Sequence, residues 1–207
     1  MATPLGAATF YGDLKDLLPG KVKTYPGWER HNRGTRGDGW GPVHGVMIHH
    51  TVTKSTSAAI ELCRTGHSGL PGPLYNVVVN KSGICHLIGW GRANHAGMGD
   101  SDVLAHVLRE ELPYPRPNET DVDGNARFYG IALLNMGDGE DPFPKAQLDS
   151  AASAAALICA IHGWSERSVI GHKEWQPGKI DPRFGMGSFR TRVRVRRQHV
   201  DAYFRGR

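Results

Sequence analysis

The stretch YNVVVNKSGICHLI occupies residues 75–88 and decides the fold expected for the chain. Its first half is rich in valine, the segment Lys81-Ser82-Gly83 is a turn signal, and an apolar run resumes at Ile84. Two apolar runs joined by a short connection that contains glycine are typical of a β-hairpin. Residues 75–88 therefore predict a pair of antiparallel strands.

Further elements are predicted on both sides of this hairpin. Apolar runs predict strands at 43–49, 128–134 and 168–170. Helical patterns predict helices at 11–18, 57–64, 101–112 and 145–163, and a last helix starting near Ser188. We expect Ser101 and Ser188 to be N-caps and Pro144 to open the longest helix. This mixture predicts an α/β fold: a mixed central β-sheet flanked by helices in three layers.

The length of the chain, 207 residues, suits one domain, or one domain with an additional arm. Glycine and proline interrupt any periodicity between residues 20 and 44. We therefore predict an N-terminal arm or covering segment at 1–40. Residues 41–207 would form the main domain and end in a basic helix.

The composition is that of a soluble globular protein, with 39% hydrophobic and 22% charged residues. No apolar run is long enough to span a membrane. The first residues lack the basic and apolar regions of a signal peptide, so export would need help from another protein. Three cysteines without a CxxC spacing, Cys63, Cys85 and Cys159, predict buried free thiols.

The chain is basic: 25 Lys and Arg against 20 Asp and Glu give a formal net charge of +5. Arginines recur through the segment from Arg190 to Arg205. A basic balance favours an anionic partner, namely nucleic acid, a membrane surface or an anionic cell wall. No nucleic-acid-binding motif is present, so nucleic acid is not a predicted partner. The alternative for the arginine run is a solvated helix face.

Histidine is frequent, with eleven residues, and two places could supply metal ligands. His49 and His50 end a predicted strand, where neighbours point to opposite faces, so at most one would bind a given ion. His172 follows another predicted strand, and Asp181 lies nine residues later, beyond a Pro-Gly turn. A loop of that length can bring both side chains to one point, with Lys179 nearby.

Two histidines and one carboxylate leave the fourth position of a zinc ion open, as in catalytic rather than structural zinc sites. Such an ion acidifies a water molecule and polarises a carbonyl oxygen. Amide hydrolysis also needs a group that orients the water and a donor for the developing oxyanion. Tyr75 and Lys179 are candidates for these roles. Spacing alone does not select this set.

A family resemblance does select it. The segments Ile48-His49-His50-Thr51, Leu74-Tyr75-Asn76-Val77, Asn94-His95-Ala96-Gly97 and residues 172–182 occur in this order. Together they resemble the type 2 N-acetylmuramoyl-L-alanine amidases, a superfamily that includes amidase-type phage lysozymes and animal peptidoglycan recognition proteins. The resemblance covers roughly residues 43–182 and implies the amidase fold and a zinc amidase catalytic domain at 41–207.

The resemblance also implies residue roles. His49, His172 and Asp181 would be the zinc ligands, Tyr75 would assist the water, and Lys179 would stabilise the oxyanion. His95 and Asn94 would line the substrate groove. Trp175 and Trp90 are further candidates for that groove, with plain core positions as the alternative.

Two positions depart from the family pattern. Many members carry a glutamate in the strand at 129–134, where the matching residue here is Ala132. We therefore expect Tyr75 and Lys179 to carry more of the catalysis. Asn76 stands where histidine is common. His50 is expected to be a packed neighbour of the site, and His162 a core histidine.

The expected function is zinc-dependent cleavage of the amide bond between N-acetylmuramic acid and L-alanine in bacterial peptidoglycan, by a phage or prophage endolysin. The protein would be made in the host cytoplasm and act on the wall after release. Its partners would be peptidoglycan and other anionic cell-wall polymers, and it would be a monomer. The alternatives are a peptidoglycan-binding module without activity and a zinc peptidase that cuts within the stem peptide.

Overall fold

The structure of the chain is a computed structural model that describes residues 1–34 and 39–207. Residues 35–38 belong to the stretch predicted to be irregular and lie outside the described residues. No helix in the described part is long and apolar enough to cross a membrane.

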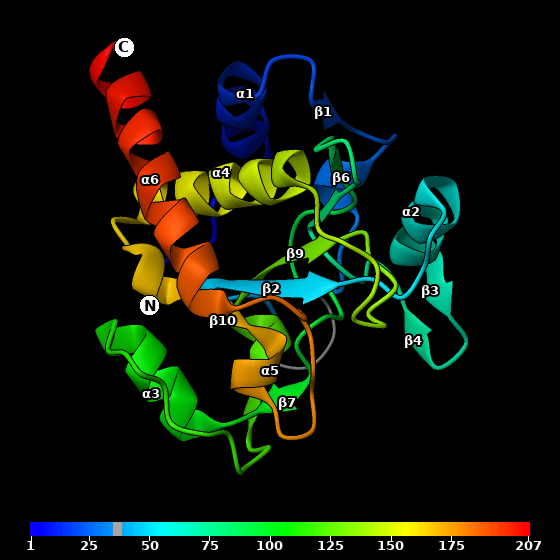
Figure 1. Cartoon of the computed structure of the whole chain (residues 1–207), viewed down its shortest axis with the longest axis vertical. Coiled ribbons are helices and arrows are strands. Elements are labelled where there is room, and N and C mark those ends of the chain that lie inside the picture. The colour runs from blue at the N-terminus through cyan, green and yellow to red at the C-terminus, as the bar shows by residue number, and fades with distance from the viewer. Residues whose placement is uncertain (35–38) are drawn as a thin grey trace.

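A mixed six-stranded sheet forms the centre of the molecule, as predicted (Figure 1). The strand order is β1-β6-β5-β9-β2-β10, and only the β5–β6 pair is antiparallel. That pair is the predicted hairpin. The strands are β1 (Val22–Lys23), β2 (Val46–His50), β5 (Val77–Val79), β6 (Cys85–Leu87), β9 (Tyr129–Leu133) and β10 (Val169–Gly171).

Helices cover both faces of this sheet, which gives the three predicted layers. In Figure 1, α4 lies above the sheet and α3 and α5 lie below it, while α2 stands at one end. The helices are α1 (Ala7–Leu17), α2 (Thr56–Thr65), α3 (Ser101–Arg109), α4 (Lys145–His162), α5 (His172–Trp175) and α6 (Met186–Arg205).

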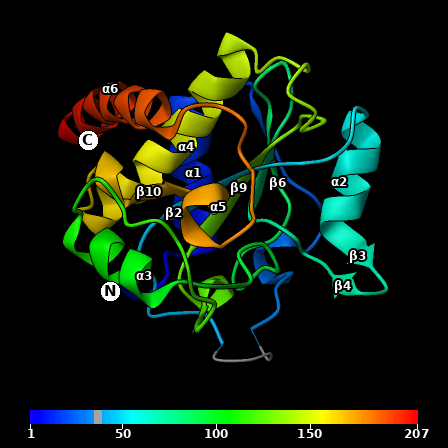
Figure 2. The same cartoon turned by 60° about the horizontal axis from the view of Figure 1, so that its bottom comes forward.

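Short elements complete the chain. The 3-10 turns are η1 (Trp28–Arg30), η2 (Gly124–Ala126) and η3 (Glu166–Ser168). The strands β3 (Gly66–His67) and β4 (Leu70–Pro71) form a small hairpin beside α2 (Figure 2), and β7 (Met98–Gly99) pairs with β8 (Val122–Asp123).

The alternation of side chains along β2 divides the core between the two faces. Val46 and Ile48 belong to the large apolar cluster under α4, whereas Met47 faces a smaller cluster with α3 and α5. His49, the next residue on the Met47 side, is therefore directed away from α4. This register positions the site described below.

The predicted N-caps of two helices are wrong. Asp100, not Ser101, caps α3, because its carboxylate accepts hydrogen bonds from the backbone N–H groups of Asp102 and Val103 at 2.9 and 3.1 Å. The last helix begins at Met186 after Gly185, ahead of Ser188. The helix α3 also ends at Arg109, before the predicted residue 112.

The described part of the predicted arm at 1–40 packs against the main core. Phe10 and Leu14 of α1 are completely buried in the cluster under α4, and β1 extends the sheet beside β6. The boundary near residue 40 stays a prediction. All three cysteines are buried free thiols, as expected.

Candidate metal centre

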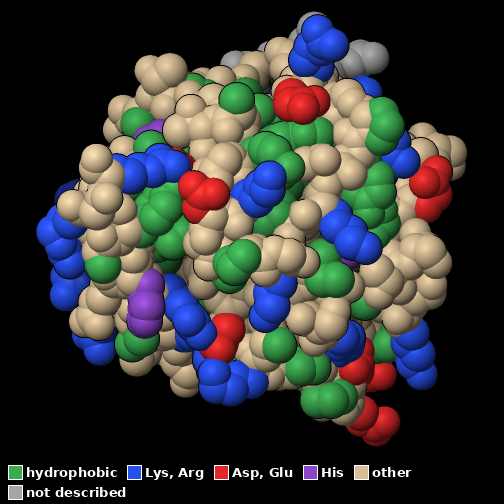
Figure 3. All heavy atoms as spheres, turned by 90° about the horizontal axis from the view of Figure 1, so that it is seen from above, with side chains coloured by type: hydrophobic (Ala, Val, Ile, Leu, Met, Phe, Trp, Pro, Cys, Tyr) green, Lys and Arg blue, Asp and Glu red, His purple; other side chains and the backbone are tan. Residues whose placement is uncertain are grey.

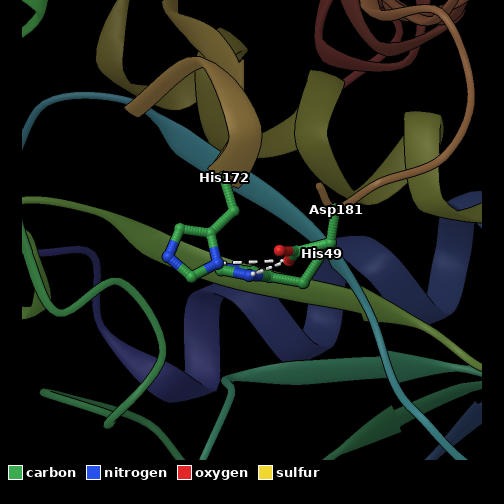
Figure 4. Close-up of side chains that lie close together, drawn as sticks. All are labelled: His49, His172 and Asp181. Carbon is green, nitrogen blue, oxygen red and sulfur yellow. Dashed lines mark hydrogen bonds and ion pairs between the residues drawn. The ribbon is translucent and has the colours of Figure 1, made fainter. Parts of the chain in front are cut away.

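Three side chains from distant parts of the sequence converge at one edge of the sheet (Figure 4). His49 lies near the end of β2, and His172 is the first residue of α5, directly after β10. Because β2 and β10 are parallel neighbours, both strands end at the same edge. The loop after α5 folds back and brings Asp181 to the two imidazoles, as the sequence predicted. One ligand atom from each residue lies within 4.8 Å of the others.

The same atom type of each histidine faces the carboxylate. The Nδ1 atoms of His49 and His172 lie 3.0 and 3.2 Å from Oδ2 of Asp181. Side-chain exposure is only 1% for His49, 8% for His172 and 14% for Asp181. The three groups are thus held together in a largely water-excluded place.

The other nitrogen of each ring is held from outside the cluster. Nε2 of His49 lies 3.0 Å from Nδ1 of His95, and Nε2 of His95 lies 3.1 Å from the carbonyl oxygen of Phe128. A carbonyl oxygen only accepts hydrogen bonds, so His95 donates through Nε2 and accepts through Nδ1. His49 must then donate to His95 through Nε2. Nε2 of His172 likewise donates to Oε1 of Gln176, at 3.1 Å.

These directions leave the Nδ1 lone pairs of both histidines aimed at a carboxylate oxygen. Burial lowers the pKa of His49 to about 4, so its ring is neutral at neutral pH. Three electron-pair donors that face one another at this distance form a group that could hold a metal ion. Zinc bonds of about 2.0–2.1 Å in a tetrahedron place ligand atoms roughly 3.3 Å apart, close to the two Nδ1–Oδ2 separations of 3.0 and 3.2 Å. The residues therefore fit a zinc ion.

The candidate catalytic side chains line a cavity of about 400 Å³ over this cluster. The ring of Tyr75 lies 5.1 Å from that of His49 between centroids. Burial raises the pKa of Tyr75 well above its ordinary value, so the phenol stays protonated and can donate a hydrogen bond. Lys179 is exposed at the rim of the same cavity, two residues before Asp181.

His95 and Asn94 also reach this cavity, but His95 is more deeply involved than a lining residue. Its exposure is 7%, and its ring bridges His49 and Phe128 as described above. The side chain of Asn94 donates to the carbonyl oxygen of Pro71 at 2.6 Å. Asn94 thereby connects the predicted substrate segment to the β3–β4 hairpin.

The prediction that Trp175 lines the substrate groove is wrong. Trp175 is completely buried, its ring packs on Phe128 at 5.0 Å between centroids, and its Nε1 donates to the carbonyl oxygen of Ala96. The candidate Trp90 is also a core residue, 4% exposed and stacked on Phe10. An indole with a hydrogen-bonded N–H suits a core position as well as it suits a substrate groove, and sequence alone does not distinguish the two.

The structure also locates the departures from the family pattern. Ala132 of β9 is the register partner of His49, so the position without a glutamate lies directly beside the first ligand. Asn76 ties neighbouring backbones together, because it donates to Gly91 and accepts from the N–H of Gly130. His50 is buried and packs against Gly137.

Three supporting residues were not predicted. Oδ1 of Asn125 accepts hydrogen bonds from the N–H groups of His95 and Ala96, at 2.8 and 2.7 Å, and so fixes the turn that carries His95. Gln176 holds His172. Gly130 lies under the His95 ring, where a Cβ atom would stand 2.8 Å from its Cγ. Asn125 lies outside the motifs, Gln176 and Gly130 lie in segments that the resemblance covers but without an implied role, and no spacing in the sequence indicates any of the three.

Comparison with known proteins agrees with this geometry. The profile of the family described as N-acetylmuramoyl-L-alanine amidase matches residues 39–184. A comparison with curated proteins found no match.

Solved structures also resemble the chain. The Staphylococcus aureus hydrolase AmiA has a TM-score of 0.56 and 11% identity, with 95% of this chain and 94% of that chain covered. The N-acetylmuramoyl-L-alanine amidase LysC from Clostridium intestinale has a TM-score of 0.53 and 16% identity, with 73% and 85% covered. The endolysin LysCS from the same organism has a TM-score of 0.50 and 17% identity, with 84% and 95% covered. At these identities the likeness establishes the fold.

Proposed function

The chain belongs to the N-acetylmuramoyl-L-alanine amidase family, and on this premise we propose that it is a zinc-dependent hydrolase of peptidoglycan. The bond cleaved would be the amide between N-acetylmuramic acid and L-alanine. The observation that carries the proposal is the convergence of three electron-pair donors, His49, His172 and Asp181, two of which, His172 and Asp181, line an open cavity. A donor set of this composition is that of catalytic zinc sites.

Zinc held by these residues would acidify a water molecule and polarise the carbonyl group of the scissile amide. The side chains around it would supply the rest. The ammonium group of Lys179, at the rim of the cavity, can donate to the oxygen that becomes negative in the transition state. The protonated phenol of Tyr75 can hold the attacking water in position by a hydrogen bond.

The presence of Ala132 in place of a glutamate makes Tyr75 and Lys179 more important for catalysis. Its methyl group is buried beside His49 and offers neither a base nor a hydrogen bond. Proton handling in the cavity would therefore rest on the groups that line it, Tyr75 and Lys179 above all. The surrounding exposed apolar side chains, Val52, Leu70 and Ile180, give the cavity an apolar rim for the substrate.

The biological setting belongs to the same proposal. We keep the hypothesis of a phage or prophage endolysin, made in the host cytoplasm and acting on the wall as a monomer after release. The name of one structural relative, the endolysin LysCS, supports it. A net charge of +5 would favour contact with an anionic wall.

The test is digestion of purified peptidoglycan with and without a chelator, followed by mass analysis of the fragments. Stem peptides with a free N-terminal alanine, lost on chelation and restored by zinc, are the expected result. Cleavage inside the stem peptide would instead identify a zinc peptidase. Binding without fragments would identify a recognition module and overturn the proposal.

A further inference from the structure

A second cavity, of about 730 Å³, lies away from the metal centre. Residues 112–117, which follow α3, form one wall, and the first half of α6 forms the other. Helix α5 separates the two cavities, because His172 faces the metal centre while the next residue, Lys173, lines the second cavity. The proposed amidase chemistry does not use this groove, which we call the α6 groove.

The α6 wall is one stripe of a helix. Gly187, Arg190, Thr191 and Arg194 recur at steps of three and four, so they share one face. The opposite wall has the sequence LPYPRP, in which Tyr114 and Arg116 alternate with prolines. The guanidinium group of Arg190 lies over the Tyr114 ring, 5.4 Å from its centroid, and joins the two walls.

The charges of Glu174 and Arg190 in this groove cancel. Arg190 donates to both carboxylate oxygens of Glu174, at 2.8 and 2.9 Å, and Glu174 also accepts from the N–H of Gly171. Arg190 additionally donates to the carbonyl oxygen of Val169 at 3.0 Å. This ion pair, which we call the brace, has a structural role. Its two side chains are engaged in contacts within the protein and are not available to an external ligand.

The remaining charges are mostly positive. Arg116, Arg167 and Arg194 are exposed and have no ion pair within residues 1–34 and 39–207. Lys173 also has no carboxylate partner among the described residues, and its Nζ donates to the carbonyl oxygen of Phe184 at 2.7 Å. Glu166 is the remaining acid among the groove residues. Four cations thus face one carboxylate across a concave surface.

Other arginines near the C-terminus behave differently. Arg192 and Arg196 pair with Asp149 of α4, Arg197 pairs with Asp201, and Arg207 pairs with Asp13 and Asp16. Figure 3, viewed from the side of the C-terminus, shows Asp and Glu side chains among the Lys and Arg side chains. Arg192 and Arg196 thus attach α6 to α4, Arg197 pairs within α6 and Arg207 pairs with α1, whereas Arg194 is left for an external anion.

We propose that the α6 groove binds the phosphodiester groups of an anionic cell-wall polymer. Exposed guanidinium groups match phosphate oxygens in geometry as well as in charge. A concave basic surface also concentrates a polyanion more strongly than scattered charges do. The inference rests on the proposed function, which places the protein on a bacterial wall, and it would keep the enzyme on that wall between cleavage events.

Gly187 allows a test that leaves the brace intact. A Cβ atom built on Gly187 meets no heavy atom within 4 Å, so a side chain fits there. Gly187→Glu adds a carboxylate to the groove, and Gly187→Gln adds the same shape without charge. Each variant is sedimented with purified walls that carry a poly(polyol phosphate), and with the same walls after that polymer has been hydrolysed away. Activity on a soluble muropeptide is measured in parallel.

We expect Gly187→Glu to bind polymer-bearing walls roughly tenfold more weakly than Gly187→Gln. Both variants should bind stripped walls equally and cleave the soluble muropeptide at the unchanged rate. Equal binding of the two variants to polymer-bearing walls would overturn the inference. Binding to duplex DNA is compared for the same two variants. If Gly187→Glu weakened binding to DNA but not to polymer-bearing walls, the groove would be assigned to nucleic acid and the inference would be overturned. Sedimentation measures binding and does not require cleavage. A failure of the amidase proposal can therefore be distinguished from a failure of this inference.

Discussion

The two faces of the central sheet are built from different chemistry. Against one face lies α4, in which Ala151, Ala152 and residues 154–156 are completely buried alanines within a large apolar cluster. Against the other face, His49, Asn76 and His95 are buried polar side chains, and each has hydrogen-bond partners. The first face gains stability from apolar area removed from water, which requires no exact direction. The second face depends on directed hydrogen bonds, and those of His95 form a chain that leads to His49.

This difference implies that stability and chemistry can be changed separately. A substitution on the α4 face should lower the free energy of unfolding and leave metal affinity alone. A substitution among the directed bonds should do the opposite. Each prediction below tests one side of this separation.

The largest expected effect is that of Asp181→Ala. Without this carboxylate only two imidazole ligands remain, and the cavity should lose its metal. Hydrolysis of peptidoglycan should fall by at least about 10³-fold, since a catalytic zinc contributes several kcal/mol of transition-state stabilisation. Metal content and turnover are measured together, with Glu140→Ala, a change at an exposed acid, as the control. Retention of both metal and activity in Asp181→Ala would show that the ligand set is wrong.

The opposite face predicts the reverse outcome for Leu157→Ala. Leu157 of α4 is completely buried, and its truncation should reduce the free energy of unfolding by about 2–5 kcal/mol. Metal affinity should stay within twofold of the parent protein, because no directed bond changes. Denaturant titration of the metal-free chain gives the stability, and Leu62→Ala, at a 41% exposed leucine, is the matched control. A parallel loss of metal affinity would break the separation between the faces.

Lys179→Ala tests a role that needs no buried contact. Lys179 is exposed, so its removal should leave both the fold and the bound metal intact. Turnover should fall roughly 10²–10³-fold, as on removal of an oxyanion donor, with a smaller change in KM. Lys179→Arg retains the charge and should recover part of the rate. Normal turnover in Lys179→Ala would remove the oxyanion role.

Sequence analysis predicted the apolar face of the sheet more completely than the face that carries the hydrogen-bonded polar residues. The valine-rich strands and the long helix at 145–163 follow from periodicity, because each buries a continuous apolar face. The convergence of His49, His172 and Asp181 was inferred from family motifs, since their spacing alone does not select them. The register of β2 beside β10 and β9 then supplies the physical reason for it.

Long-range polar contacts account for what was missed. Asn125 fixes the turn of His95 from thirty positions away, and Gln176 holds His172, yet no pattern in the sequence gives either residue this role. The prediction for Trp175 was wrong for a different reason. An indole whose N–H donates to a backbone carbonyl looks the same in sequence as one that binds a substrate. The caps at Asp100 and Gly185 were displaced from the predicted serines by one and three residues.

A smaller loss of metal affinity is expected for His95, which contacts the ligand His49 and not the metal itself. His95→Ala removes the acceptor that makes His49 donate through Nε2, so Nδ1 is no longer kept free for the metal. Zinc affinity, measured by competition with a chelator, should fall roughly 10–100-fold. His95→Asn restores an acceptor and should recover part of that loss. Asn94→Ala is the control at the neighbouring position and should leave zinc affinity unchanged.

Gly130→Ala gives an independent version of the same test. The added Cβ atom would stand 2.8 Å from Cγ of His95 and must displace the ring, although no polar atom has changed. Zinc affinity should therefore fall in the same direction as in His95→Ala. Parent-like zinc affinity in both variants would show that the hydrogen-bond chain from Phe128 does not position His49.

The last expected effect is a pH dependence of stability, to which both faces contribute. Burial lowers the pKa of His44, beside Trp164 at the end of α4, and the pKa of His86, on the other face, to about 4 each. Both groups should titrate near 6.5 when unfolded, so the unfolded chain binds more protons between pH 6.5 and 4. The free energy of unfolding of the metal-free chain should therefore fall as the pH drops through this window, by at most about 1.4 kcal/mol per pH unit for each histidine. His44→Phe and His86→Phe should each flatten the slope by a similar amount, whereas His67→Gln, at an exposed position, should leave it unchanged. Flattening by only one of the two would show that the other histidine does not contribute to acid unfolding.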